Sequence, residues 1–274
     1  MSTTAAAVRN DERNNGASWL AHGFQNNDSE PLRRFLEAWH KRHRAVADDK
    51  RAKKPQLERE AYAVFRAFFV PSKPDLEKAY VVIQKELKVT LVDDDFSGLY
   101  ARMENYENGD MRLSTPSELL SQLQVISRVT LHDFRPAVSI EGPKVLYLTR
   151  DHLHELLEFL AVEPKSEFHH VPLVDRYWDL EHGADPWVPE KDDELTARKR
   201  RLAYLNSQLN IIPGHFGTGW HFATHPLAYN LYLNQDRTRA VVAFRQGYGG
   251  GEAYLKRTDK GDWVVVARQH DWME

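Results

Sequence analysis

The chain has 274 residues, of which 42% are hydrophobic and 28% charged, and its formal net charge is −3 at pH 7. These values are close to those of ordinary globular proteins and exclude wholesale disorder, and the slight negative charge lacks the basic excess of a nucleic-acid-binding protein. Because the chain contains no cysteine, disulfides, thiolate metal sites, iron–sulfur clusters and cysteine nucleophiles are excluded.

The amino-terminal residues 1–28 are small and polar, with Asn-Asn and Asn-Gly steps, and this composition predicts a flexible tail. The stretch has no apolar core of the kind found in signal peptides. The sequence therefore favours the cytoplasm and leaves open an exported protein whose signal has been removed. No apolar run approaches the roughly 18–20 residues of a membrane span, so we expect no membrane association.

Residues 29–165 predict a mixed α/β region that starts with two helices. The first begins at Ser29 or one residue earlier and has Pro31 in its first turn, and the second covers Pro55 to Val70. The basic stretch HKRHRAVADDKRAKK between them is a candidate anion-binding patch. Two aspartates interrupt it, which favours a solvated helix end and loop.

Three strand patterns follow in the same region. In YVVIQKELKVTLVD, apolar residues 87, 89 and 91 alternate with polar ones, and RVTLHDF and KVLYLT predict two further strands, the last leading into a helix near Thr149. His132, Asp133 and Arg135 place an imidazole, a carboxylate and a guanidinium at the end of one strand. Asp133 and Arg135 are therefore candidate binding residues, although a structural ion pair is the favoured interpretation.

Residues 166–191 contain several prolines and two tryptophans and predict an ordered connector. Residues 192–274 predict a helix with acidic residues at its start, followed by four antiparallel strands. The strands read LAYNLYLN, RAVVAFRQ, AYLKR and WVVVARQHDWME, with turns at NQDRT and TDKGD and a break or bulge at GYGGGE. This part of the chain either has its own core or shares one with residues 29–165.

The helix and the bent four-stranded meander resemble the end of nuclear-transport-factor-2-like (NTF2-like) and cystatin-like folds. The resemblance is carried by the segments AVVAF at 240–244, GGGEA at 249–253 and GDW at 261–263. It implies a curved sheet, and the same segment resembles the C-terminal parts of uncharacterised bacterial proteins. These folds include enzymes, binding modules and assembly domains, so the resemblance implies no particular function.

Three histidines lie close together in GHFGTGWHFATHP, at His215, His221 and His225. Pro226 disfavours a helix here, and on a strand His221 and His225 would stand ~13 Å apart, too far to hold one ion. We therefore expect no metal site. A pocket lined by His221 and His225 is the functional interpretation, and a tryptophan-bearing core face with a solvated histidine face is the favoured structural one.

If that pocket exists, His221 is its candidate acid–base residue, Tyr248 or Glu252 assists, and Trp220 contributes to binding. Glu252 directly follows the glycine run GYGGG. We expect it to be an exposed surface charge rather than a pocket residue.

The sequence thus predicts an α+β fold in which N-terminal helices and a mixed α/β region precede a helix and a curved antiparallel four-stranded meander. With no catalytic motif and no sign of a cofactor, it favours a non-enzymatic protein that binds a protein partner or a small ligand, such as an immunity or accessory protein. The alternatives are a small-molecule enzyme with a pocket around His221 on the C-terminal sheet, and a homodimerisation module that uses the edge strands of that sheet.

Overall fold

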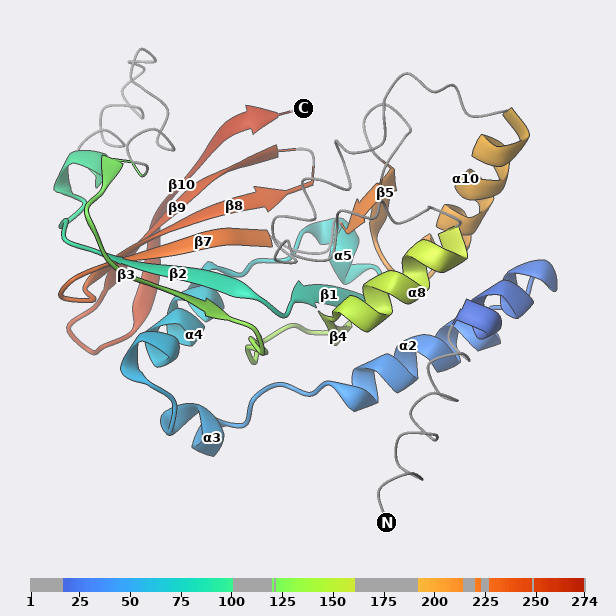
Figure 1. Ribbon diagram of the computed structural model, residues 1–274, viewed down its shortest axis with the longest axis horizontal. Helices are drawn as coiled ribbons and strands as arrows, with labels where there is room; N and C mark the ends of the chain where they lie inside the picture. The colour runs from blue at the N-terminus through green and yellow to red at the C-terminus, as the bar shows by residue number, and fades with distance from the viewer. Residues whose placement is uncertain are drawn as a thin grey trace. The chain divides into compact units, whose positions relative to one another are not determined.

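The computed structural model describes residues 17–100, 120, 122–160, 192–213, 220–222, 227–247 and 249–273. They form an α+β fold, as the sequence predicts (Figure 1). None of the described helices is long and apolar enough to cross a membrane. In chain order the elements are α2 (Glu30–Arg42), α3 (Asp48–Ala52), α4 (Gln56–Phe68), α5 (Lys73–Leu76), β1 (Tyr80–Gln84), β2 (Leu87–Val92), β3 (Val125–Leu131), β4 (Lys144–Leu148), α8 (Arg150–Leu160), α10 (Asp192–Asn206), β5 (Ile211–Pro213), β6 (Trp220–Phe222), β7 (Leu227–Asn234), β8 (Arg239–Gln246), β9 (Gly249–Arg257) and β10 (Trp263–Met273).

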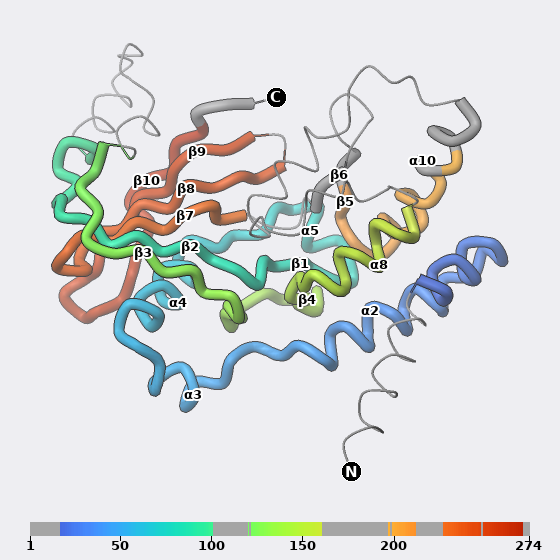
Figure 2. The backbone as a smooth tube through the Cα atoms, viewed as in Figure 1, coloured from blue at the N-terminus to red at the C-terminus, as the bar shows by residue number. Residues whose placement is uncertain are grey.

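The chain divides into two compact units that interleave along the sequence (Figure 2). Unit 1 takes Met1–Arg44, Ser72–Ile83 and Glu141–Thr224, and unit 2 takes Ala45–Pro71, Gln84–Ile140 and His225–Glu274. The predicted boundaries instead followed the chain, with residues 29–165 before the connector and 192–274 after it. Since β2 and β3 pair into the same sheet as the C-terminal strands, each unit draws on both predicted regions.

In unit 1, helix α2 packs against the two-stranded sheet of β1 and β4. The indole Nε1 of Trp39 donates a 2.9 Å hydrogen bond to the carbonyl oxygen of Tyr147, and the ring of His152 stacks on Trp39 with centroids 4.3 Å apart. Helix α8 buries Leu153, Leu156, Leu157 and Leu160 along one side. The helix predicted near Thr149 is therefore confirmed.

The structure departs from the predicted tail at residues 17–25, which are helical. Leu20 is fully buried, and Phe24 packs edge-on against Phe159 and Tyr204. A Cβ atom at Gly23 would lie 2.2 Å from the Tyr204 hydroxyl, so glycine permits the close approach. In WLAHGF, Leu20 and Phe24 stand four residues apart, which is the spacing of neighbours on one face of a helix. The polar residues around them favoured a tail instead.

Unit 2 is built on a six-stranded sheet with the order β10-β9-β8-β7-β2-β3. The predicted antiparallel meander is present as β7 to β10, and β2 extends it by pairing parallel to β7, with β3 antiparallel at the outer edge. The buried Gln84 prolongs the parallel pairing beyond β2, because its amide accepts from the nitrogen of Ala228 at 2.6 Å and donates to the oxygen of Ala228 at 2.9 Å.

One face of this sheet is apolar and packs against α4. The rings of Phe68 and Phe244 lie 5.4 Å apart. Glu60 is buried on the same helix, where it accepts from Trp263 Nε1 at 3.0 Å and pairs with Arg257 at 3.1 Å. These contacts tie α4 to the last two strands.

On the opposite face, an apolar cluster covers one end of the sheet. Its buried members are Val92, Phe96, Leu99, Leu120, Val241 and Tyr254. The segment directly after β2 supplies Phe96 and Leu99, so this segment helps to close the core of unit 2 on that side.

Where the sequence predicts a break or bulge at the glycine run, the sheet is not broken, because strand β9 begins inside the run. The pairing of β9 with β10 shifts register opposite the run, between His270 and Trp272, and again opposite Leu255 and Tyr254, between Val265 and Ala267. A Cβ atom at Gly251 would lie 1.9 Å from the carbonyl oxygen of Gln269. The glycines therefore let the last two strands approach closely. The predicted hairpin at TDKGD is confirmed, with Gly261 at φ +88°.

Candidate functional site

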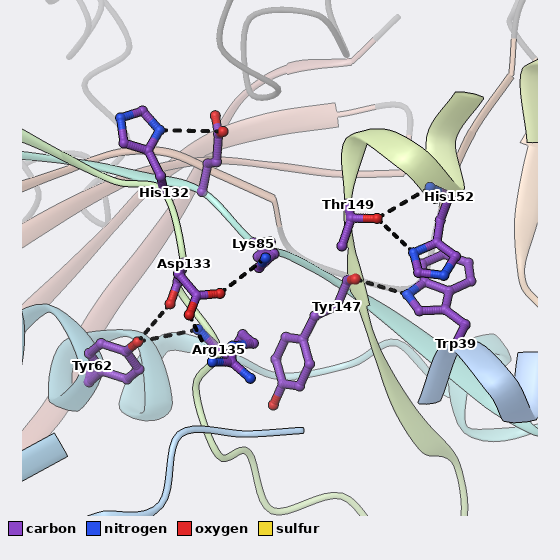
Figure 3. A network of polar contacts seen from close by, with 10 residues as sticks. Trp39, Tyr62, Lys85, His132, Asp133, Arg135, Tyr147, Thr149 and His152 are labelled. Carbon is purple, nitrogen blue, oxygen red and sulfur yellow. Dashed lines mark hydrogen bonds and ion pairs between the residues drawn. The ribbon is translucent and has the colours of Figure 1, made fainter. Parts of the chain in front are cut away.

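Asp133 and Arg135 meet at the end of β3, in unit 2, within a network of polar contacts (Figure 3). Arg135 donates to one carboxylate oxygen of Asp133 at 2.7 Å, and Lys85 Nζ lies 3.1 Å from the other. The hydroxyl of Tyr62, on α4, donates to the Asp133 carbonyl and accepts from the backbone nitrogen of Arg135, both at 3.3 Å. The network joins the segment after β3 to α4.

The electrostatics of this network favour a structural role. Partial burial raises the pKa of Asp133, but hydrogen bonds from Arg135 and Lys85 outweigh burial and leave the pKa of the carboxyl below its usual value. The carboxylate is thus ionised and held between two cations at neutral pH. Next to it, His132 Nδ1 lies 3.4 Å from Glu86. The structural ion pair that the sequence favoured is therefore present, and a binding role for Asp133 and Arg135 stays a prediction.

The remaining labelled residues of Figure 3 belong to unit 1 and surround His152. The Nδ1 atom of this buried histidine lies 2.6 Å from the hydroxyl of Thr149, and its ring stacks on Trp39. This is a histidine packed in the core. Among the described residues, no group of three or more histidine, aspartate or glutamate side chains could hold a metal ion.

The residues of the proposed His221 pocket are divided between two sheets. The strand β6 carries Trp220 and His221, opposite Pro213 and Ile212 of β5, in a separate two-stranded sheet. His225 and Tyr248 lie outside the described residues. His221 thus does not belong to the six-stranded sheet on which the sequence placed the pocket, and its role as an acid–base residue stays a prediction.

The prediction that Glu252 is an exposed surface charge is wrong. Glu252 lies in β9, the second strand from one edge of the six-stranded sheet, and only 3% of its surface is exposed. The sequence suggested exposure because the residue follows a glycine run that was taken for a break in the strand. In the structure the run is itself paired on both sides.

The outer edge of the six-stranded sheet is the feature that sequence reasoning missed. Five consecutive residues of β3, from Val125 to Val129, are exposed, and three of them are large and apolar. Ile126 is 46% exposed and Val129 36%. A strand with one buried face alternates apolar and polar residues. The adjacent apolar residues Val125 and Ile126 break this alternation, so the sequence itself indicates an apolar residue on each face of β3.

The pairing of β3 is regular over most of its length. Ser127 to Leu131 pair without a break with Leu91 to Leu87 of β2, and the single irregularity is at Ile126. On this regular run Ser127 and Val129 share one face, while Arg128 and Thr130 share the other. The other side of the strand has no neighbour in the described sheet.

No protein-family model matches the chain, no curated protein matches it, and no solved structure matches it.

Proposed function

We propose that this protein binds an extended segment of another protein, which adds a strand to the sheet along β3. The observation that carries the proposal is the run of five exposed residues on an outer strand that pairs regularly from Ser127 onward. An outer strand presents unpaired backbone N–H and C=O groups, and proteins usually protect such an edge with charges, bulges or a covering element. In strand addition, these groups bind the main chain of the partner, and alternate side chains give specificity.

The side chains of β3 indicate the chemistry of the partner. Val129 at the centre of the regular run favours an apolar residue opposite it, and Val125 and Ile126 extend this apolar surface at one end. Arg128 on the other face favours an acidic residue. The expected ligand is thus a short extended segment in which an acidic residue is adjacent to apolar residues.

The length of the regular run favours a short segment over a second copy of the chain. A stable protein dimer buries roughly 1,200–2,000 Å² of surface. A pairing that uses only Ser127–Leu131 from each copy would be much smaller, whereas a peptide needs no larger contact.

The proposal is tested by selecting binders from a library of displayed peptides. We expect the selected peptides to share the predicted pattern and to lose at least about tenfold in affinity for Val129→Lys, which puts a charge at the centre of the edge. The matched control is Val264→Lys, at an exposed valine of β10, the other edge of the sheet, which should bind like the wild type.

Three results would overturn the proposal. They are the absence of any peptide that depends on Val129, equal losses in both lysine variants, and a wild-type mass that doubles with concentration and returns to that of a monomer in Val129→Lys. The last result, measured by sedimentation, would show that a second copy occupies β3.

A further inference from the structure

Unit 1 contains a cavity of about 470 Å³ between residues 24–29 and the C-terminal half of α10. This volume falls within the range of about 300–1,000 Å³ that is typical of small-molecule sites. Three of the lining residues, Arg200, Ala203 and Ser207, are exposed, so a ligand can enter the cavity from solvent. The other lining residues are Phe24, Asn27, Ser29 and Tyr204.

Two aromatic rings form one wall of the cavity. Phe24 and Tyr204 meet edge-on with their centroids 6.0 Å apart, and both are half-buried, so part of each ring is left to contact a ligand. The Tyr204 hydroxyl donates to the carbonyl oxygen of Asp28 at 2.8 Å, which fixes the ring. Burial and the charge of Asp28 raise the pKa of the Tyr204 phenol, although a backbone hydrogen bond lowers it. The phenol is therefore neutral at pH 7 and adds no negative charge to this wall.

The polar lining consists of hydrogen-bond donors that the described protein leaves unused. Within the described part of the chain, no hydrogen bond or ion pair involves the side chain of Arg200 or Asn27. Ser29 precedes α2, and its hydroxyl makes no capping hydrogen bond. The carboxylate of Asp28 does not line the cavity and instead accepts from the backbone nitrogen of Glu30 at 2.9 Å. The described lining thus carries a positive charge without a carboxylate to neutralise it.

We propose that this cavity binds a small aromatic acid, with its ring against Phe24 and Tyr204 and its carboxylate at Arg200. A guanidinium pairs with a carboxylate through two parallel N–H donors, and the Asn27 amide and the Ser29 hydroxyl provide further donors. Aromatic rings add an edge-on or offset contact to the free energy of burial. An acid without a ring loses this contact, and a neutral aromatic compound loses the pairing with Arg200.

Calorimetric titration of the full chain with benzoate, phenylacetate and 3-phenylpropionate tests this site. We expect at least one of these acids to bind saturably, and acetate and the neutral amide of the best acid to bind at least about tenfold more weakly. The cyclohexyl analogue of the best acid should also bind more weakly, because it lacks the aromatic ring. The proposal is overturned if no acid binds at about 10 mM, or if any of the three comparison compounds binds as well as the best acid.

Two variants locate the binding. Arg200→Gln removes the charge, and Ala203→Leu fills the cavity and keeps the charge; each should weaken the best acid at least about tenfold. Both positions are exposed, so we expect both variants to fold. The matched control is Lys199→Gln, which removes a positive charge from an exposed neighbour that does not line the cavity and should bind like the wild type.

Unchanged affinity in Arg200→Gln or in Ala203→Leu would overturn the proposal. An equal loss in Lys199→Gln and Arg200→Gln would also overturn it, because it would show a general effect of charge. Val129→Lys, at the edge strand of unit 2, should bind the acid like the wild type, so this site and the peptide site can fail separately.

Discussion

The two edges of the six-stranded sheet are built differently. The pairing of β10 with β9 changes register twice. Arg268 of β10 lies over the ring of Phe68, 4.8 Å from its centroid, and donates a hydrogen bond to the carbonyl oxygen of Phe68. The edge strand β3 pairs regularly from Ser127 onward and is exposed on both faces over five residues. One edge is thus irregular and attached to α4, while no described strand pairs with the outer side of the other.

The alternation of residues along a strand and the protection of a sheet edge are therefore separate properties. Bulges and inward-packed charges make an edge a poor template for another strand. From Ser127 onward, the described pairing of β3 has no bulge, and such an edge favours aggregation unless a partner strand binds to it. The following variants test whether the β10 side is held by the contacts named above and whether β3 is free to accept a partner.

The largest expected effect is at Gly251, on the β10 side. In Gly251→Ala the new methyl group would meet the backbone oxygen of Gln269 at 1.9 Å, so the two strands must separate, which we expect to cost about 3 kcal/mol of unfolding free energy. Urea denaturation measures the loss. The control is Gly98→Ala, where a Cβ atom meets nothing within 4 Å and stability should be unchanged or slightly higher.

The next effect is at Glu60, the buried carboxylate that links α4 to β9 and β10. Glu60→Ala removes the acceptor of Trp263 Nε1 and the partner of Arg257, and should cost about 2 kcal/mol in the same denaturation experiment. Glu58→Ala removes a more exposed carboxylate, which pairs with Lys54, and should cost less than about 1 kcal/mol. Equal losses would mean that Glu60 is not an anchor.

A smaller, pH-dependent effect is expected at Asp133, which fastens the end of β3. Because the folded-state pKa of this carboxyl is lowered, its contribution is present above the pKa of the unfolded chain, near 4, and is lost as the pH falls through the folded-state pKa. Asp133→Asn should therefore cost about 0.5–1 kcal/mol at pH 7 and progressively less below pH ~4. In a Lys85→Met background, Asp133→Asn should cost less at pH 7 than it does in the wild type. A cost that stays the same at low pH would contradict the ion-pair explanation.

The smallest effect on stability is expected at Val129. Because this valine is exposed at the open edge, Val129→Lys should change the unfolding free energy by no more than about 0.5 kcal/mol. A loss above about 2 kcal/mol would show that Val129 is a core residue and that its effect on binding is indirect. Thermal and urea denaturation of the variant give the value.

Much of the fold follows from local sequence patterns. The amphipathic spacing of α2, α4 and α8 and the alternation in β2 and β7 identify these elements directly, and the glycine of TDKGD identifies its turn. Pairing between distant segments has no such local signature. The parallel contact of β2 with β7, which carries β2 and β3 into the C-terminal sheet, depends on tertiary packing.

The candidate sites were less predictable than the fold. The Asp133 and Arg135 pair was visible because its members are two residues apart at a strand end. The burial of Glu252 was not, because it depends on the pairing of β9 with a strand on each side. The exposure of β3 likewise depends on its position in the strand order, which the sequence does not state.

The most direct test of strand addition is hydrogen exchange of the backbone amides, measured for the free protein and for the protein saturated with a selected peptide. Strand addition at β3 predicts slower exchange in residues 125–131 on binding and unchanged exchange in β10, because new main-chain hydrogen bonds form only at the open edge. Protection that appears in β10, or binding that leaves β3 unchanged, would contradict the proposed function.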